Sequence, residues 1–370
     1  MINLFCVHMP ASVDEPLLET LHSGWIGQGI KVDKFEDELK ERLKNPHVLT
    51  LNNGTAGLHL ALRLAGIGHE DEVITTPMTC LATNMPILAC GAFPVWTDID
   101  PATGNIDPAK IEENITVKTK AIICMHFGGY PCDLDEINQT AREHNLRVIE
   151  DAAHALGAEY KGNPIGTHSD FVMFSLQAIK HISTIDGGLL CCKEEQDYRL
   201  GKLLRWYGID READKIELRC EGDVKNWGYK YHMSDVMAVI GIEQLKYLDG
   251  ILAKHRKNAA YYDVEFEARQ IKRCKPLKYR NDRLSAYWLY TLLVDDRDEF
   301  VKFMRNNGVG VSRAHARNDI HSCFDKFKRD DLLGVDYFDS HQVAIPIHWG
   351  LTDDDKSFIM NKIEEFEGIK

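Results

Sequence analysis

The sequence has no apolar run long enough to span a bilayer, which excludes a membrane-spanning helix. Residues 1–6 lack a charged segment followed by a long apolar stretch, so we expect no signal peptide. No Cys-x-x-Cys pair occurs among the ten cysteines, and most of them lie in apolar runs such as Leu190-Cys191-Cys192. Buried free thiols in a reducing compartment are the simplest interpretation, which predicts a cytoplasmic protein.

An excess of basic residues is also absent. The chain carries 44 basic and 57 acidic residues, for a net charge of −13. This balance argues against a general binding surface for nucleic acid or for an anionic membrane, and it still allows a local basic pocket for a phosphorylated ligand. Repeats and low-complexity tracts are not found, and the 370 residues are enough for a large core in two domains.

Short apolar runs alternate with amphipathic segments along the first part of the chain. This alternation predicts an α/β fold with a mainly parallel sheet and right-handed crossovers. We expect strands at 47–51, 73–76, 93–97, 119–126, 148–149, 171–174 and 187–192. We expect helices at 33–43, 58–65, 133–144, 236–245 and 248–269. The first 30 residues are expected to be extended and irregular, and residues 210–227 to form a long charged excursion.

The C-terminal part changes character and predicts a second, smaller α/β domain. We therefore expect a large domain over residues 1–245 and a small domain over residues 246–370. The expected elements of the small domain are strands at 287–294 and 342–347 and helices at 298–307 and 353–366.

One stretch carries a candidate reactive lysine. Residues 171–174 form an apolar run typical of a strand covered on both faces, and the run ends in a polar turn that carries Lys180. Enzymes of the α/β class bind ligands in crevices beyond the carboxyl ends of such strands, where a nucleophilic amine is useful. Taken alone, a lysine after a strand is most often a solvated loop charge.

A second segment strengthens the functional interpretation of Lys180. Residues 147–154 spell Arg-Val-Ile-Glu-Asp-Ala-Ala-His, another strand that ends in an acid, small residues and a histidine. An aspartate and a lysine at the ends of neighbouring strands are what pyridoxal phosphate needs. The amine bonds covalently to the cofactor aldehyde, and Asp151 pairs with the protonated pyridine nitrogen, which keeps the ring an electron sink.

A turn of small residues, Gly54-Thr55-Ala56, joins the strand at 47–51 to the helix at 58–65. Such a turn leaves free backbone N–H groups and the positive end of the helix dipole, which suits a phosphate. By itself this signal is weak, since any strand-to-helix turn can contain these residues.

Four motifs occur in a fixed order along the chain. They are Asn-Gly-Thr-Ala at 53–56, Glu-Asp-Ala-Ala-His at 150–154, Phe-Ser-Leu-x-x-x-Lys at 174–180 and Asp-Gly-Gly at 186–188. Together they resemble the nucleotide-sugar aminotransferases, which are pyridoxal-phosphate enzymes of fold type I that act on keto-sugars. The resemblance covers nearly the whole chain.

The resemblance implies a role for each motif residue. Lys180 would bind the cofactor covalently and shuttle protons between the substrate and cofactor carbons. Asp151 would pair with the pyridine nitrogen. His154 would pack near the ring and its oxygen, and a core histidine with a backbone partner is an equal alternative. The cofactor phosphate would be held by Gly54, Thr55, Ala56 and Ser175.

Three positions depart from the family pattern. Cys80 stands where many members carry an aromatic side chain that stacks on the cofactor, and a thiol stacks more weakly. Lys230 stands where many members have an asparagine that reaches the phosphate in the neighbouring subunit, and an ammonium meets a phosphate as a point charge. Asp186 replaces the usual glutamate. If Lys230 serves the neighbouring cofactor, a homodimer is required.

The implied reaction is transamination in two halves, with pyridoxamine 5′-phosphate as the intermediate form of the cofactor. L-Glutamate gives its amine, and a keto-sugar linked to a nucleoside diphosphate receives it. The resemblance leans toward 4-aminotransferases of the GDP-perosamine synthase type, which act on 4-keto-6-deoxyhexoses in polysaccharide and O-antigen biosynthesis. Candidate contacts to the two substrates are Gly27, Gly29, Arg205, Arg211, Arg313, His315 and His348.

Two alternatives stay open. The 3-dehydratases of the same family carry a histidine in place of the lysine, and His181 is adjacent to Lys180. The five-residue spacing from Ser175 puts Lys180 in the reacting position, which argues against a dehydratase. A non-enzymatic regulator that kept the fold is the second alternative. The intact Lys180 and Asp151 argue against it, as does the lack of an attached DNA-binding segment.

Overall fold

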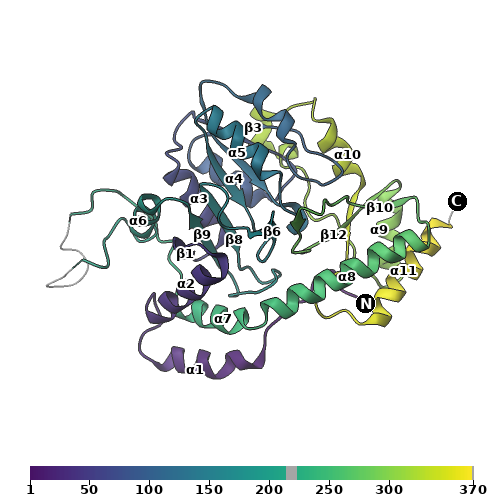
Figure 1. Cartoon of the computed structure of the whole chain (residues 1–370), viewed down its shortest axis with the longest axis horizontal. Helices are drawn as coiled ribbons and strands as arrows, with labels where there is room; N and C mark the ends of the chain where they lie inside the picture. The colour runs from purple at the N-terminus through teal and green to yellow at the C-terminus, as the bar shows by residue number, and fades with distance from the viewer. Residues whose placement is uncertain (214–222, 369–370) are drawn as a thin grey trace.

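A computed structural model of the chain describes residues 1–213 and 223–368. Its centre is a seven-stranded sheet with helices packed on it (Figure 1). The strand order is β1-β9-β8-β5-β4-β2-β3, and β9 is antiparallel to its neighbours while the remaining strands run parallel to one another. The strands are β1 Val48–Leu51, β2 Glu72–Thr75, β3 Phe93–Trp96, β4 Thr119–Met125, β5 Arg147–Asp151, β8 Phe171–Ser175 and β9 Gly188–Cys192. The predicted α/β fold with a mainly parallel sheet is confirmed.

Strand β8 shows why this sheet needs helices on both faces. Successive side chains of a strand point to opposite faces. Phe171 and Met173 belong to one hydrophobic cluster, and Val172 and Phe174 belong to another. All four are buried, so the strand has no polar face. The helices packed on the sheet are α2 Ile30–Leu43, α3 Gly54–Leu64, α4 Leu81–Ala89, α5 Leu134–Glu143, α6 Glu195–Leu204 and α7 Asp235–Leu245.

The C-terminal part builds a second, three-stranded sheet in the order β10-β12-β13. Gly308 closes helix α9 with a positive φ of 79°, as its position in the sequence predicts. The elements are β10 Cys274–Pro276, β12 Tyr290–Val294, β13 Gln342–Ile345, α9 Arg297–Asn306, α10 Leu333–His341 and α11 Asp353–Glu367. Short 3₁₀ segments lie at Ala11–Val13, Pro108–Lys110, Glu112–Asn114, Phe127–Gly129, Asn318–Ile320 and Ser322–Phe327. The division of the chain at residue 245 stays a prediction.

Helix α8 (Leu248–Ala268) contributes to both cores. Its N-terminal half places Leu248 and Leu252 in the cluster beneath the central sheet. Its C-terminal half places Tyr262 and Phe266 in the cluster of the smaller sheet. Figure 1 shows this single long helix running along the lower side of the molecule from α7 toward the C-terminus.

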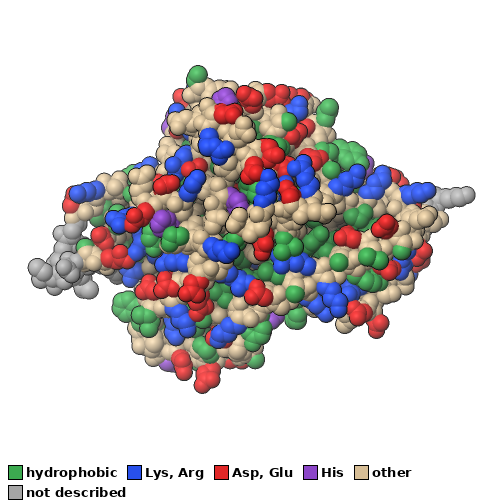
Figure 2. Space-filling view, viewed as in Figure 1, with side chains coloured by type: hydrophobic (Ala, Val, Ile, Leu, Met, Phe, Trp, Pro, Cys, Tyr) green, Lys and Arg blue, Asp and Glu red, His purple; other side chains and the backbone are tan. Residues whose placement is uncertain are grey.

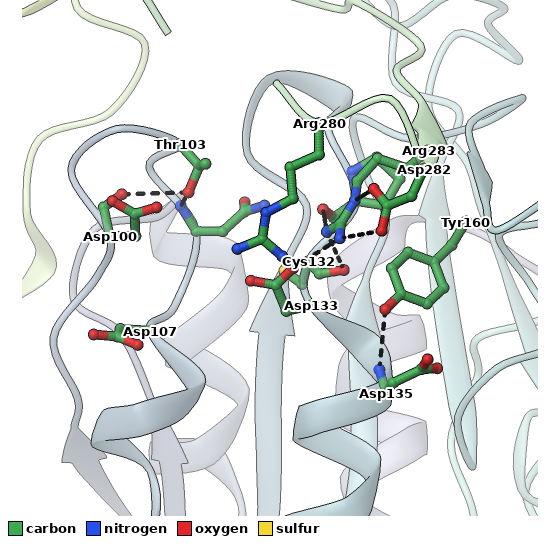
Figure 3. A network of polar contacts seen from close by, with 12 residues as sticks. Asp100, Thr103, Asp107, Cys132, Asp133, Asp135, Tyr160, Arg280, Asp282 and Arg283 are labelled. Carbon is green, nitrogen blue, oxygen red and sulfur yellow. Dashed lines mark hydrogen bonds and ion pairs between the residues drawn. The ribbon is translucent and has the colours of Figure 1, made fainter. Parts of the chain in front are cut away.

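A third small sheet joins the two parts of the chain. It has the order β11-β6-β7, with β11 at Arg283–Leu284, β6 at Glu159–Tyr160 and β7 at Asn163–Pro164. The buried guanidinium of Arg283 pairs with Asp133 and Asp282 and donates to two main-chain carbonyls (Figure 3). Arg280 shares Asp133 at 2.8 Å. This network fastens the segment that leads into β12 to the loop after β4.

The N-terminal region differs from expectation. Residues Asp14–His22 form helix α1, so the prediction of extended and irregular chain was wrong there. Val13 and Leu17 pack against two buried residues of α7, Val239 and Ile240. The helix therefore depends on tertiary packing that local periodicity does not reveal.

Two further sequence-based expectations concern the surface. The charged excursion expected at 210–227 falls partly outside the described residues. In the parts that are described, none of the helices is long and apolar enough to cross a bilayer. Acidic and basic side chains are interspersed on the face shown in Figure 2.

Candidate active site around Lys180

Lys180 lies on the turn that follows β8 and lines a cavity of about 640 Å³. The turn is fixed by main-chain hydrogen bonds, from Leu176 N–H to Gly187 O at 2.8 Å and from Lys180 N–H to Gln177 O at 2.9 Å. Asp151 ends β5, the strand that pairs with β8, and lines the same cavity. The sequence-based expectation that an acid and a lysine meet at neighbouring strand ends therefore matches the geometry.

The carboxylate of Asp151 is buried and accepts two hydrogen bonds. Thr83 Oγ1 donates to Oδ2 at 2.7 Å, and the Ala153 N–H donates to Oδ1 at 3.0 Å. Burial raises the pKa of Asp151, and these two donors oppose that shift. An ionised carboxylate at this position suits a protonated ring nitrogen.

The amine of Lys180 lies over the indole of Trp288, with Nζ 3.7 Å from the ring centroid. Trp288 is itself buried and donates its indole N–H to the Ile179 carbonyl at 2.9 Å. Burial lowers the pKa of Lys180 to about 8, although the nearby Asp151 and Cys80 favour the charged form. A substantial neutral fraction near neutral pH makes the amine a competent nucleophile.

Two histidines line the same cavity. The His154 ring stacks on Trp288 with centroids 3.7 Å apart and lies 5.4 Å from the His315 ring. Within the described residues, His154 Nδ1 and His315 Nε2 are buried without a hydrogen-bond partner. Burial, together with the charge of Lys180, lowers the pKa of His154 well below its usual value and that of His315 to about 3. Both rings are therefore neutral and offer free ring nitrogens to a ligand.

The turn at 54–56 opens helix α3 next to Ser175. Asn53 caps the helix, since its side chain accepts from the Ala56 N–H at 2.7 Å. A Cβ on Gly54 would meet Met173 Sδ at 3.0 Å and Ser175 Cβ at 3.3 Å, so a larger residue here would require side chains of β8 to shift. The N–H groups of Gly54 and Thr55, the first two of α3, have no partner within the helix and are suited to an anion.

Gly188 of β9 explains the Gly-Gly motif. A Cβ at this position would lie 2.6 Å from the carbonyl carbon of Asn53 and 2.7 Å from the Gly54 nitrogen. Such distances are far inside van der Waals contact. The bare backbone of β9 therefore leaves room for the turn that would hold a phosphate.

The structure brings most of the expected cofactor residues together and leaves other candidates elsewhere. Of the predicted residues, the cavity is lined by Gly54, Thr55, Cys80, Asp151, His154, Ser175, Lys180, Asp186 and His315. Ala56 lies beside it, with its N–H occupied by Asn53. Gly27, Gly29, Lys230, Arg313 and His348 do not line this cavity within one chain, so their roles stay predictions.

Gly27 and Gly29 lie in a loop held by Asp235. The Asp235 N–H donates to Gly27 O at 2.7 Å, and the Gly29 N–H donates to Asp235 Oδ1 at 2.7 Å. Gly29 lines a separate cavity of about 620 Å³ together with Arg211. Arg313 and His348 also have partners outside the cavity. Arg313 forms an ion pair with Asp339 at 3.6 Å, and His348 Nε2 lies at hydrogen-bond distance, 3.1 Å, from Asn3 O.

Lys230 has an exposed side chain, but its backbone is fastened beside the phosphate turn. Asn52 donates its side-chain amide to Lys230 O at 3.3 Å and its N–H to Tyr231 O at 2.7 Å. Arg205, another candidate contact to substrate, is instead buried in an ion pair with Glu36 and also donates to Thr50 O. Its guanidinium is therefore satisfied inside the protein.

His181 is buried and does not line the cavity, since its Nε2 bonds to Ala286 O at 2.9 Å. Lys180, and not His181, therefore lines the cavity that also contains Asp151. This placement does not favour the dehydratase alternative.

Sequence reasoning missed two residues, Thr83 and Trp288. Thr83 lies on the first turn of α4, whereas Thr79 lies before the helix begins, so no helical spacing marks the pair in the sequence. Trp288 lies 108 residues beyond Lys180 in the chain. No local pattern connects the two, so only the tertiary structure brings them together.

The residues of the cavity fit pyridoxal 5′-phosphate. Asp151 would hold the pyridine nitrogen, Lys180 the aldehyde carbon, and the α3 turn with Ser175 the phosphate. The two unpartnered histidine nitrogens and the space left by Gly54 and Gly188 are consistent with a polar, flat ligand at this position.

Comparison with known proteins identifies the family. The model of the DegT/DnrJ/EryC1/StrS aminotransferase family matches residues 10–364. The chain belongs to this family. Among the similar proteins is the GDP-perosamine synthase of Caulobacter vibrioides, which is 32% identical over 359 residues, or 94% of this chain and 94% of that protein. The predicted resemblance is thereby confirmed.

Solved structures of sugar aminotransferases share the whole fold. The sugar aminotransferase CalS13 from Micromonospora echinospora has a TM-score of 0.94 and 38% identity, covering 99% of this chain and 100% of that one. Spr1654 from Streptococcus pneumoniae, described as a sugar aminotransferase and solved in a PLP form, has a TM-score of 0.92 and 27% identity over 99% of this chain and 98% of that one. Membership of the family thus implies dependence on pyridoxal phosphate and confirms the fold-type I architecture.

Proposed function

We propose that this protein transfers an amino group from L-glutamate to a 4-keto-6-deoxyhexose linked to a nucleoside diphosphate. The observation that carries the proposal is the shared cavity of Lys180 and Asp151, in which the lysine pKa is lowered to about 8. The sugar nucleotide is supported by family members that act on such compounds, among them the GDP-perosamine synthase described above.

Each residue of the cavity has a part in this proposal. When bound, pyridoxal 5′-phosphate would supply an aldehyde that accepts an amine and a ring that withdraws electrons from the reacting carbon. Asp151 keeps a proton on the ring nitrogen. Lys180 takes a proton from the donor carbon in the first half-reaction. In the second it gives a proton to the sugar carbon that receives the amine. Ser175 and the N–H groups of Gly54 and Thr55 hold the phosphate.

The substrate contacts are proposed from position and chemistry. His315, with its neutral ring and free nitrogen, is placed to bind a hydroxyl or phosphoryl group of the sugar nucleotide. Gly27, Gly29, Arg313 and His348 would form the outer substrate surface. We expect the enzyme to work in the cytoplasm, in keeping with the buried free thiols found in the core.

A homodimer is part of the proposal, with Lys230 reaching the cofactor phosphate of the neighbouring subunit. The exposed ammonium on a backbone fastened next to the phosphate turn supports this role. Exposed apolar side chains in the N-terminal loop, Trp25 and Ile26, and at the start of α2, Ile30, offer a surface for a second copy.

The decisive experiment is spectroscopic and chemical. Purified protein incubated with pyridoxal 5′-phosphate should turn yellow, and borohydride reduction should add the cofactor mass to the peptide that contains Lys180. L-Glutamate, but not D-glutamate, should bleach the colour before reduction. A panel of nucleotide-linked 4-keto-6-deoxyhexoses then identifies the acceptor by the mass of the aminated product. Colourless protein without added mass at Lys180 refutes the proposal, and loss of water from the sugar in place of amine transfer supports the dehydratase.

A further inference from the structure

Asp151 is the end of a chain of hydroxyl groups. Thr83 Oγ1 lies 2.7 Å from Asp151 Oδ2, and Thr79 Oγ1 lies 2.7 Å from Thr83 Oγ1. All three side chains are buried, with exposed fractions of 2% for Asp151 and 0% for both threonines. No part of the proposed reaction requires this chain, and neither threonine lies in the four sequence motifs described above.

The chain has one direction. An ionised carboxylate only accepts hydrogen bonds, so the single proton of the Thr83 hydroxyl goes to Asp151. Thr83 must then accept from Thr79, which gives its own proton. Each hydroxyl is oriented by the next, and the last proton points at the carboxylate.

Asn318, from the C-terminal part of the chain, anchors this chain of hydroxyls. Its side-chain amide donates to Thr79 O at 2.7 Å and its Oδ1 accepts from Asn84 Nδ2 at 2.8 Å. Its N–H donates to Pro77 O at 2.7 Å. Asn318 is 1% exposed and lies three residues after His315 of the cavity. Asn318 therefore fixes the position of the loop before α4 relative to the segment that carries His315.

The balance of forces on Asp151 makes Thr83 important. Burial raises the pKa of the carboxyl, and the strongest opposing influence is the hydrogen bond from the Thr83 hydroxyl, followed by that from the Ala153 N–H. The charges of Lys180 and His126 also favour the charged form of Asp151. The nearby Cys124 thiol has a strongly raised pKa, so it stays neutral and adds no charge beside Asp151. Removing the Thr83 hydroxyl should therefore raise the pKa of Asp151 further, and a neutral carboxylic acid cannot pair with a protonated ring nitrogen.

We propose that Thr83 is a positioning residue that keeps Asp151 ionised and oriented toward the lysine cavity, and that Asn318 holds Thr83 in place through Thr79. The inference rests on the proposed function for the identity of the ring that Asp151 binds. It adds the segment around Asn318, from the C-terminal part of the chain, to the residues that position the ring.

The test uses 4′-deoxypyridoxine 5′-phosphate, which has the ring nitrogen and phosphate but no aldehyde, so that Lys180 chemistry does not enter. We expect Thr83→Val, which is nearly the same shape, to weaken its binding to the full chain by about tenfold, the loss of one hydrogen bond to a charged group. The acid limb of binding should move to higher pH, because Asp151 becomes protonated sooner. Thr83→Ser should restore both, and Thr291→Val, at another buried threonine, should change neither.

A double-mutant cycle separates positioning from general damage. In an Asp151→Asn background, Thr83→Val should cost little more, because the residue it acts through is already gone. Asn318→Asp should weaken binding in the wild-type background and have no added effect beside Thr83→Val. Unchanged affinity and pH response in Thr83→Val, or equal losses in both backgrounds, overturn the inference. If the wild-type protein binds neither this probe nor pyridoxal 5′-phosphate, the proposed function fails instead.

Discussion

The amine of Lys180 lies 3.7 Å from the centroid of the Trp288 ring, although the two residues come from opposite halves of the chain. The same ring stacks on His154, and its N–H holds the carbonyl of Ile179, the residue before the lysine. Trp288 thus shapes both the position of the amine and its solvent environment. It supplies an aromatic surface in a cavity where Cys80 supplies none.

The lowered pKa of Lys180 predicts how fast the apo-protein takes up its cofactor. The neutral amine attacks the aldehyde, so the rate should rise with pH and level off above a midpoint of about 8. Below that midpoint it should fall about tenfold per pH unit. Stopped-flow absorbance measures the rate. Nα-acetyl-lysine, whose amine is fully solvated, should have its midpoint about two units higher. A protein midpoint near that of the free amine contradicts the burial argument.

Trp288→Ala should move that midpoint upward, by about one unit. Removing the indole lets water reach the amine, and solvation favours the charged form. The loss of the ring also removes a cation–π contact, which acts in the opposite direction, but burial is the larger influence on Lys180. Trp288→Phe keeps an apolar ring and should leave the midpoint nearly unchanged. A downward shift in the alanine variant would show that the ring contact dominates.

Mixing two inactive variants tests whether Lys230 serves the other subunit. Lys180→Ala and Lys230→Ala homodimers should each have little activity. Unfolding and refolding them together produces heterodimers with one intact and one doubly damaged site, so activity should return to about a quarter of the wild-type value. If Lys230 acts within its own chain, no site in the heterodimer is intact and activity stays low. Separately refolded samples serve as the control.

Gly188→Ala should weaken cofactor binding through the phosphate. The added methyl would collide with the backbone at Asn53 and push the phosphate turn away from Ser175. We expect at least a tenfold loss of affinity for pyridoxal 5′-phosphate, or about 1.4 kcal/mol, and little change for pyridoxal, which lacks the phosphate. Fluorescence titration measures both. Gly250→Ala in helix α8, where the new methyl meets nothing, should leave affinity intact and raise stability.

Arg205→Met should destabilise the fold by about 3–5 kcal/mol, because it strands the buried carboxylate of Glu36. Urea unfolding of the apo-protein measures this cost. Arg199→Met, which breaks an exposed pair with Glu195, should cost less than about 1 kcal/mol. Equal costs for the two variants would mean that the inner pair contributes no more than a surface contact. Double replacement of Glu36 and Arg205 by apolar residues should recover much of the loss.

The sequence predicted what depends on strand order and strand ends. Asp151 and Lys180 meet because β5 and β8 are adjacent and parallel, and a run of buried residues followed by a polar turn is visible in one dimension. The phosphate turn was predictable for the same reason, since a strand, small residues and a helix follow one another directly. Such features need no knowledge of distant contacts.

The rest of the site depends on contacts between distant parts of the chain. Trp288 and Asn318 reach the cavity and its supporting threonines from the C-terminal half, and their neighbours in sequence give no sign of it. Helix α1 was missed because it has few apolar side chains, and its Leu17 is covered only by packing against α7. Arg205 was misjudged for a related reason, since a charged residue is usually exposed and its burial depends on Glu36, which lies far away in the sequence.

Helix α8 has a consequence for how the molecule melts. One end of this helix is buried in the core beside the central sheet, and the other end is buried in the core of the C-terminal sheet. Unfolding of either core would disrupt the helix and thereby remove packing contacts from the other core. Heating the protein in a calorimeter should therefore give a single endotherm, with no separate transition for the C-terminal sheet.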